Sequence, residues 1–355
     1  MMPARAALTG PISRVEPIPY ARRKPHGDEV LRLDSNEGPA PPRALLADLA
    51  DADLDLLRRY HDAAALEAAL ATRFGVGEER VIVTAGADEA IDRACRAFLE
   101  PGRTLLLPDP TFELFERFAT LAGGELQRVS WPSGPFPGDA FLERLDARTA
   151  VVAVVSPNNP TGAVATGADV RGLASAAPDA LLLLDHAYVE YADYDLTPAV
   201  LDLPNVLVVR TFSKAWGLAG CRVGYAIGSP YVVSVLRAAG GPYPVGSPSI
   251  ALALHQLERG EAALRAHVAR VREERTALTA WLAARSFAPH VSQANFLLAD
   301  FGALSARVCA GLSSLGVLVR DFPLRAGLET ALRITLPGDP AQFERLCAAL
   351  DRVLS

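Results

Sequence analysis

Residues 206–214 read Val-Leu-Val-Val-Arg-Thr-Phe-Ser-Lys, an apolar run that turns polar and ends in a lysine. A continuous apolar run of this kind is typical of a strand that is buried on both faces of a parallel sheet. A lysine just beyond such a strand can lose its proton through desolvation and attack a carbonyl carbon to form a Schiff base. Arginine cannot do this, because its guanidinium stays protonated. The stretch therefore predicts a buried sheet with a reactive amine at its edge.

The composition makes this lysine stand out further. The chain has 355 residues and 35 basic side chains, of which only Lys24 and Lys214 are lysines, and all the others are arginines. The alternative for Lys214 is an ordinary solvated lysine. That interpretation suits Lys24, which follows two arginines, better than it suits a lysine after a buried strand.

Charge and hydropathy exclude several classes of protein. The formal net charge is −6 and the pI about 5.6, whereas a nucleic-acid-binding domain is normally basic. The longest apolar runs, residues 151–155 and 181–184, are far shorter than the ~20 residues that span a bilayer. The first residues lack the apolar core of a secretion signal, and the four cysteines lack the spacing of a metal site. We expect a cytoplasmic globular protein with packed, reduced thiols and no metal, membrane or nucleic-acid partner.

From about residue 45, short apolar runs alternate with polar loops and helical periodicity. Such alternation predicts an α/β fold, in which a mainly parallel sheet is flanked by helices. Ligands of such sheets lie beyond the carboxyl ends of the strands, where the polar segments fall in this sequence. The apolar runs occupy residues 81–83, 105–107, 151–155, 181–184, 206–209 and 223–227.

The pattern changes after Gly240-Gly241-Pro242. A long helical stretch over roughly 249–285 precedes short strands near 295–298, 317–320 and 332–335 and a final helix from about Pro340. This predicts a second, smaller α+β domain. The predicted division is an N-terminal arm over 1–34 that packs with the small domain, a large domain over 35–241 and a small domain over 242–355.

Two further motifs follow predicted strands. Asp185 ends the run 181–184, with Tyr188 three residues on, and a carboxylate there could keep a pyridine nitrogen protonated. The alternative for Asp185 is a helix cap or a turn residue. Residues 156–162 read Ser-Pro-Asn-Asn-Pro-Thr-Gly, which is either a plain turn or a functional loop in a chain that is poor in asparagine.

A third motif predicts an anion site. Gly86-Ala87-Asp88 opens a predicted helix, and the free N–H groups and the dipole of a helix N-terminus suit a phosphate. Ser213 and Arg222 could add a hydroxyl and a guanidinium. No G-x-G-x-x-G follows the first strand and no G-x-x-x-x-G-K-[ST] occurs, so neither a dinucleotide nor a nucleotide on a P-loop is implied.

Together these motifs resemble the pyridoxal-phosphate enzymes of fold type I, in the class I/II aminotransferase family. Within that family the chain is most similar to the histidinol-phosphate aminotransferases. The lysine, Asn-Pro-Thr-Gly and Asp-x-Ala-Tyr motifs are specific for the superfamily and less specific for the substrate. Matching segments run over almost the whole chain and include Pro19-Tyr20, residues 33–37, Arg59-Tyr60, residues 86–89, 110–112, 156–162, 185–188, 212–214, 220–222, 242–244, 293–296, 319–321 and 332–335.

The resemblance implies that pyridoxal 5′-phosphate is the cofactor. Lys214 would carry it as a Schiff base and would move the proton of the substrate Cα, while Asp185 would pair with the pyridine nitrogen. The remaining cofactor contacts implied are Asn159 and Tyr188 to the O3′ oxygen, Phe112 stacked on the ring, and Ala87, Asp88, Ser213 and Arg222 around the phosphate. The family resemblance also implies a homodimer with a shared active site, in which Tyr60 reaches the phosphate bound by the partner subunit.

The resemblance also implies a substrate site. Arg333 resembles the arginine that binds the carboxylate of an amino acid or the substrate phosphate, and Arg320 resembles a second arginine that grips the phosphate. Two forked donors suit a dianion better than one. Tyr20 and Asn36 complete the substrate-binding residues that the match implies.

Four positions depart from the family pattern. His186 replaces a glutamate in the Asp-x-Ala-Tyr motif and is expected to point away from the ring. Phe112 keeps the stacking surface of the usual tyrosine but lacks its hydroxyl. Gly38 and His61 replace larger or different residues near the expected substrate.

The leading hypothesis is transamination between L-histidinol phosphate and 2-oxoglutarate, giving imidazole acetol phosphate and L-glutamate, as in histidine biosynthesis. One alternative is an aminotransferase for aromatic or other amino acids. A second is an enzyme that resembles the phosphothreonine decarboxylases, which also need paired arginines. A third is a pyridoxal-phosphate-binding regulatory protein without turnover.

Overall fold

The larger of two sheets forms the base of the molecule. The structure, a computed structural model, describes residue 11 and residues 30–50, 54–60 and 62–355. The strands of this sheet are β2 (Val81–Thr84), β3 (Thr104–Asp109), β4 (Glu125–Ser130), β5 (Thr149–Val155), β6 (Leu181–Asp185), β7 (Val206–Thr211) and β8 (Gly224–Ile227). Their order is β2-β8-β7-β6-β5-β3-β4. Only β8 runs antiparallel to its neighbours, so the expected mainly parallel sheet is confirmed.

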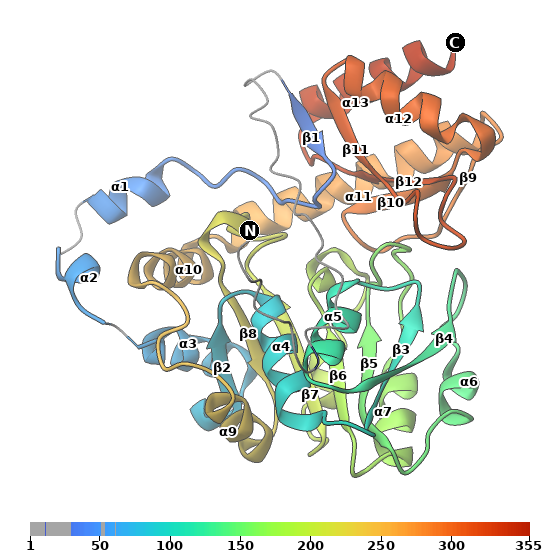
Figure 1. The fold of residues 1–355 in the computed structure, drawn as a ribbon. Helices are drawn as coiled ribbons and strands as arrows, with labels where there is room; N and C mark the ends of the chain where they lie inside the picture. Colours follow the sequence, from blue (N-terminus) through green and yellow to red (C-terminus); the bar gives the residue numbers. More distant parts are fainter. Residues whose placement is uncertain (1–10, 12–29, 51–53, 61) are drawn as a thin grey trace, which may run out of the picture.

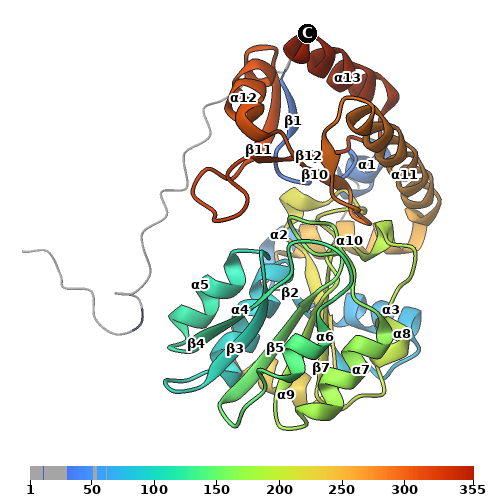
Figure 2. The ribbon, with the colours of Figure 1, turned by 90° about the vertical axis from the view of Figure 1, so that its right-hand side faces the viewer.

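Helices cover both faces of this sheet (Figure 2). Because side chains alternate between the faces of a strand, Val151 and Ala153 of β5 pack with one set of helices, while Val152 and Val154 pack with the other. The first set is α4 (Ala87–Phe98), α5 (Leu114–Leu121) and α9 (Pro230–Ala238). The second set is α6 (Gly138–Leu142), α7 (Gly167–Ala176) and α8 (Thr197–Val200), and α3 (Ala64–Phe74) packs beside β2.

The smaller sheet joins the two ends of the described chain (Figure 1). Its strands are β1 (Leu31–Leu33), β9 (Ala288–Pro289), β10 (Phe296–Asp300), β11 (Val317–Asp321) and β12 (Ala331–Thr335), in the order β1-β11-β12-β10-β9. β1 pairs with β11 in parallel, and the other pairs are antiparallel. Its helices are α11 (Glu261–Ala283), α12 (Ser305–Ser314) and α13 (Pro340–Leu354). The predicted division at residues 34 and 241 stays a prediction.

The helical stretch expected over 249–285 is two helices, not one. α10 (Ser247–Arg259) ends and α11 begins at Gly260, whose N–H donates to the carbonyl of Gln256 over 2.8 Å. A Cβ at residue 260 would lie 2.6 Å from that carbonyl oxygen, so the close approach at this junction needs glycine. The two short helices α1 (Ala44–Ala50) and α2 (Asp55–Arg58) stand out from the body beside α10 (Figure 1).

The edge strand β4 was not predicted from the sequence. Its residues are Glu-Leu-Gln-Arg-Val-Ser, and only Val129 among them is buried, because a strand at the edge of a sheet is partly exposed. Among the described residues, no helix combines the length and the apolar character that crossing a membrane requires.

Candidate active site

A cavity of about 410 Å³ lies between the two sheets, and residues of both line it. It contains every predicted site residue that the structure describes, except Tyr60. Those residues are Asn36, Ala87, Asp88, Phe112, Asn159, Asp185, Tyr188, Ser213, Lys214, Arg222, Arg320 and Arg333. Tyr20 and His61 lie outside the described residues. Within the described part of the chain, no group of His, Cys, Asp and Glu could hold a metal ion.

One wall of the cavity carries groups that suit an anion. α4 begins at Ala87, so the first N–H groups of that helix have no partner within it. Arg222 donates from one guanidinium nitrogen to Asp88 over 3.1 Å and from the other to the hydroxyl of Ser213 over 3.4 Å. A Cβ on Gly224 of β8 would lie 2.5 Å from the backbone nitrogen of Ala87. Only glycine therefore allows this strand to approach the N-terminus of α4 so closely.

Asp185 lies at the carboxyl end of β6 and is almost fully buried. Burial raises the pKa of Asp185 to about 7, the N–H of Ala187 lowers it through a hydrogen bond of 2.9 Å, the charge of Asp88 raises it and that of Lys214 lowers it. A carboxyl group in this position is costly to ionise unless a cation faces it. Asp185 is therefore suited to pair with a protonated nitrogen in the cavity.

The amine of Lys214 points into the same cavity. Its Nζ donates to the carbonyl of Ser35 over 3.2 Å and lies 5.5 Å from the centroid of the Tyr188 ring. The backbone of Lys214 is also tightly packed, because a Cβ on Gly38 would lie only 1.7 Å from its carbonyl oxygen. Gly38 therefore has a packing role: it allows the segment around residues 34–39 to lie against the backbone of Lys214.

Asn36 connects the segment 34–39 to both sheets through hydrogen bonds. It is buried and has a left-handed backbone with φ 54°. Its Nδ2 donates to the hydroxyl of Tyr188 over 3.1 Å, and its backbone N–H donates to Oγ1 of Thr335 over 3.1 Å. The Thr335 hydroxyl in turn donates to Asn36 Oδ1 over 2.9 Å. These bonds hold the wall of the cavity between β12 and the segment after β6.

Arg333 of β12 crosses from the smaller sheet to the larger one. Its guanidinium donates to Oδ1 of Asn159 over 2.6 Å and to the carbonyl of Asp34 over 2.8 Å. Burial lowers the pKa of Arg333 and nearby Arg320 lowers it further, while Tyr188, Asp34 and Glu113 raise it.

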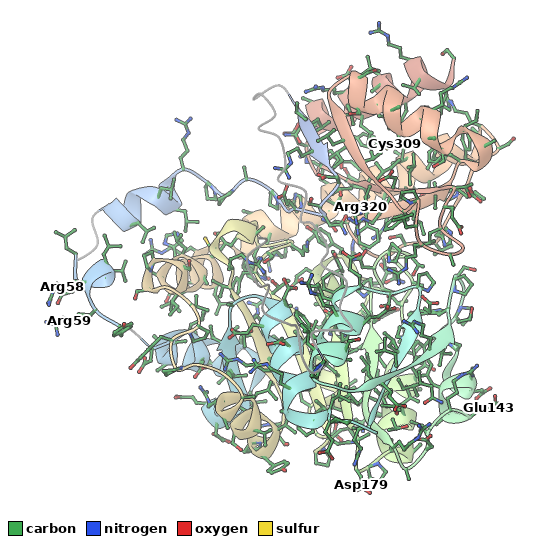
Figure 3. All side chains as sticks on the ribbon, in the orientation of Figure 1. Arg58, Arg59, Glu143, Asp179, Cys309 and Arg320 are labelled. Carbon is green, nitrogen blue, oxygen red and sulfur yellow. The ribbon has the colours of Figure 1, made fainter. Side chains whose placement is uncertain are left out.

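Arg320 of β11 is the register partner of Arg333, and Figure 3 shows it where the smaller sheet faces the larger one. The side chain of Arg320 is exposed, and its guanidinium lies 5.8 Å from the ring centroid of Phe322. Two guanidiniums of adjacent strands thus belong to one wall of the cavity. An anion bound there would relieve their mutual repulsion.

Two residues of the matched motifs, Tyr60 and Asn158, do not line the cavity. Tyr60 is 84% exposed, lies outside the cavity and stacks on Tyr243 at 4.9 Å between ring centroids. Asn158 is structural, because its Oδ1 accepts from Thr111 over 2.7 Å and its Nδ2 donates to the carbonyl of Pro110 over 2.9 Å. Asn159 is the asparagine of the pair that lines the cavity.

Ten residues that line the cavity were not predicted as site residues, and three of them carry polar or charged side chains that bear on the site. Glu113, Ser35 and Arg325 all line the cavity, and Arg325 lies 3.5 Å from Asp109 of the larger sheet. Glu113 directly follows Phe112, but no motif or periodicity in the sequence gives it a role. No sequence motif marks Arg325, because it reaches the cavity only through the way the two sheets pack against each other.

His186 points away from the cavity. It is almost fully buried, its Nδ1 lies 3.3 Å from Oγ1 of Thr197, and it does not line the cavity. Burial lowers the pKa of His186 to about 3; Asp195 raises this pKa, and Arg210 lowers it. The imidazole is therefore neutral at neutral pH, which makes its 3.7 Å approach to Asp195 a contact without an ion pair.

Comparison with known proteins gives a consistent assignment. The family model "Aminotransferase class I and II" matches residues 28–350. A histidinol-phosphate aminotransferase of Geobacillus sp. (strain WCH70) is 33% identical over 333 residues, which cover 92% of this chain and 90% of the relative.

Solved structures share the fold. The histidinol-phosphate aminotransferase of Sinorhizobium meliloti in complex with pyridoxal-5′-phosphate superposes with a TM-score of 0.88 at 26% identity, covering 100% of this chain and 99% of the other. The L-threonine-O-3-phosphate decarboxylase of Porphyromonas gingivalis has a TM-score of 0.77 at 24% identity, covering 92% of this chain and 99% of the other, and shares the fold alone.

The buried His186 predicts how stability depends on pH. Below pH ~6.5 the unfolded chain binds a proton at this imidazole and the folded chain does not, so the free energy of unfolding falls as the pH drops from 6.5 towards 3. Between pH 7 and 5, the wild type should lose about 2 kcal/mol more than His186→Asn, at about 1.4 kcal/mol per pH unit. Urea unfolding of both proteins at the two pH values measures this difference. Equal losses in the two proteins would contradict a neutral, buried imidazole.

Proposed function

The chain belongs to the class I and II aminotransferase family, and from this premise we propose that it transfers the amino group of L-histidinol phosphate to 2-oxoglutarate. The products are imidazole acetol phosphate and L-glutamate, a reaction of histidine biosynthesis. The observation that carries the proposal is the pair Arg320 and Arg333 in one cavity with Lys214 and Asp185. The pair supplies two forked donors for a phosphate, and the 33% identity to a histidinol-phosphate aminotransferase supports the same substrate.

The donors of the cavity fit pyridoxal phosphate. The N-terminus of α4, the Ser213 hydroxyl and the Arg222 guanidinium suit its phosphate, and the buried Asp185 suits its ring nitrogen. The face of Phe112 suits its ring. When bound, this cofactor supplies a carbonyl carbon that takes up an amino group and a ring that withdraws electrons from the carbon bearing that group.

The hydrogen bonds within the cavity leave one donor on Asn159 and one on Tyr188 for the O3′ oxygen of the cofactor ring. Asn159 accepts from Arg333 through Oδ1, which leaves its Nδ2 as a donor. The hydroxyl of Tyr188 accepts from Asn36, which leaves its own hydrogen to donate. Both groups would therefore donate to the O3′ oxygen, while Arg333 stays fixed for the substrate.

The remaining roles follow from position. Asp185 would hold a proton on the ring nitrogen, because a cation beside it removes the cost of its buried charge. Lys214 would use its primary amine both to hold the cofactor and to move the proton of the substrate Cα. In the glutamate half of the reaction, Arg333 would bind the α-carboxylate. Tyr20, whose position is not described, and Asn36 would lie at the substrate.

We further propose a cytoplasmic homodimer. Tyr60, Leu54 and Leu57 are each more than 70% exposed, and Tyr243, which stacks on Tyr60, is half exposed. An exposed apolar group of this kind favours a protein interface. Across it, Tyr60 would reach the phosphate site of the second subunit.

The proposed substrate can be tested with a set of amino donors. Cofactor-loaded protein is mixed separately with L-histidinol phosphate, L-phenylalanine, L-glutamate and O-phospho-L-threonine, and the absorbance of the bound cofactor reports amino-group transfer. We expect L-histidinol phosphate and L-glutamate to react fastest, without release of CO₂. Faster transfer from L-phenylalanine would favour an aromatic aminotransferase, and CO₂ from O-phospho-L-threonine would favour a decarboxylase. No transfer from any amino donor would favour a regulatory protein.

The role of Lys214 gives a separate prediction. Lys214→Arg should abolish turnover and change the absorbance spectrum of the bound cofactor, because a guanidinium stays protonated and cannot attack a carbonyl carbon. Lys24→Arg is the matched control and should leave both unchanged. If Lys214→Arg kept more than about a tenth of the wild-type rate, the amine of Lys214 would not be the carrier.

A further inference from the structure

Most charged groups of the cavity already have partners within the described chain. Arg222 is paired with Asp88, and Arg325 lies against Asp109. The carboxylate of Glu113 is different, because the described residues give it no hydrogen bond and no ion pair. Glu113 is thus a hydrogen-bond acceptor without a partner among the described residues, in a cavity that Arg320 and Arg333 also line.

Glu113 has no evident structural task. It precedes the first residue of α5, yet its side chain makes no capping hydrogen bond, and the side chain is exposed. An acidic residue at the N-terminus of a helix gains ~0.3–1 kcal/mol from the helix dipole, which is the simplest alternative reason for its presence. Its position is more specific than that: it directly follows Phe112, lines the same cavity as Arg333, and its charge raises the pKa of that arginine.

The proposed substrate has a group that suits this carboxylate. The reacting carbon of L-histidinol phosphate bears two arms, one ending in a phosphate and the other in an imidazole. The paired arginines suit the phosphate. The imidazole carries an N–H donor and, with an ordinary pKa near ~6.5, a positive charge in part of the molecules at neutral pH. A carboxylate accepts a charge-assisted hydrogen bond from such a group.

The other substrates under consideration lack this group. L-Glutamate carries a second carboxylate in place of the imidazole and L-phenylalanine an apolar ring. O-phospho-L-threonine carries its α-carboxylate there, and its methyl group lies on the carbon that bears the phosphate. None of these arms donates a hydrogen bond to a carboxylate. We infer that Glu113 accepts a hydrogen bond from the imidazole of the amino donor and is a specificity-determining residue of the site; this inference rests on the proposed function.

The test compares the two half-reactions of one variant. In Glu113→Gln the side chain keeps its shape and loses its charge. We expect kcat/KM with L-histidinol phosphate to fall about tenfold, mainly through KM, because the amide oxygen of glutamine still accepts a hydrogen bond but lacks the charge that strengthens it. The glutamate half-reaction involves no imidazole, so its kcat/KM should stay within about twofold of the wild type. Single-turnover absorbance of the bound cofactor measures both.

Glu116→Gln is the matched control, because Glu116 lies in α5 three residues after Glu113, pairs with Arg128 and does not line the cavity. It should leave both half-reactions unchanged. If Glu113→Gln lowers kcat/KM in neither half-reaction, or lowers it equally in both, the inference is overturned. The proposed function would stay intact in either case. If the wild type itself fails to react with L-histidinol phosphate but reacts with L-glutamate, the proposed function fails instead.

Discussion

The short segment from Asp34 to Pro39 is the constraint on which the site depends, because it lies between the two sheets and touches both. The smaller sheet holds it through Arg333, which binds the Asp34 carbonyl, and through Thr335, which exchanges hydrogen bonds with Asn36. The larger sheet meets it at the turn after β7. There Gly38 lies against the Lys214 carbonyl, and a Cβ on Gly217 would lie 2.4 Å from the Pro39 carbonyl oxygen. The lysine is therefore positioned by a segment nearly 180 residues away in the sequence.

Electrostatics explains why this arrangement is suited to a charged ligand. Asp185 and Arg333 are both buried, and burial opposes the charged form of each, raising the pKa of the acid and lowering that of the arginine. A buried charge without a partner is destabilising, whereas a ligand of opposite charge compensates for the cost. A phosphorylated pyridine and an anionic substrate would each bring such a partner. The burial that makes these two charges costly would therefore favour the binding of such ligands.

Much of the fold was predictable from the sequence, because buried parallel strands are continuous apolar runs and their carboxyl ends carry the polar residues. The runs at 151–155, 181–184 and 206–209 fall within β5, β6 and β7, and Asp185 and Lys214 both line the cavity. β4 was missed because an edge strand is polar. The end of α10 at Gly260 was missed because a close contact, rather than a break in periodicity, requires that glycine. Gly38 and Glu113 could not be interpreted without the packing of distant segments, since neither belongs to a periodic pattern.

The most direct test of this account is the affinity for pyridoxal phosphate of a protein in which the Asp34–Pro39 segment is displaced. In Gly38→Ala the added methyl group would collide with the Lys214 backbone. The control Gly172→Ala adds a methyl group on α7 that meets no atom within 4 Å beyond its chain neighbours and the backbone of its own helix. Titration of each purified protein with the cofactor, followed by absorbance, measures the affinity. We expect binding weaker by about tenfold or more for Gly38→Ala, since small displacements at a preorganised site have effects of this order, and unchanged binding for Gly172→Ala. Wild-type affinity in Gly38→Ala would contradict it, because the segment would then not set the position of the lysine.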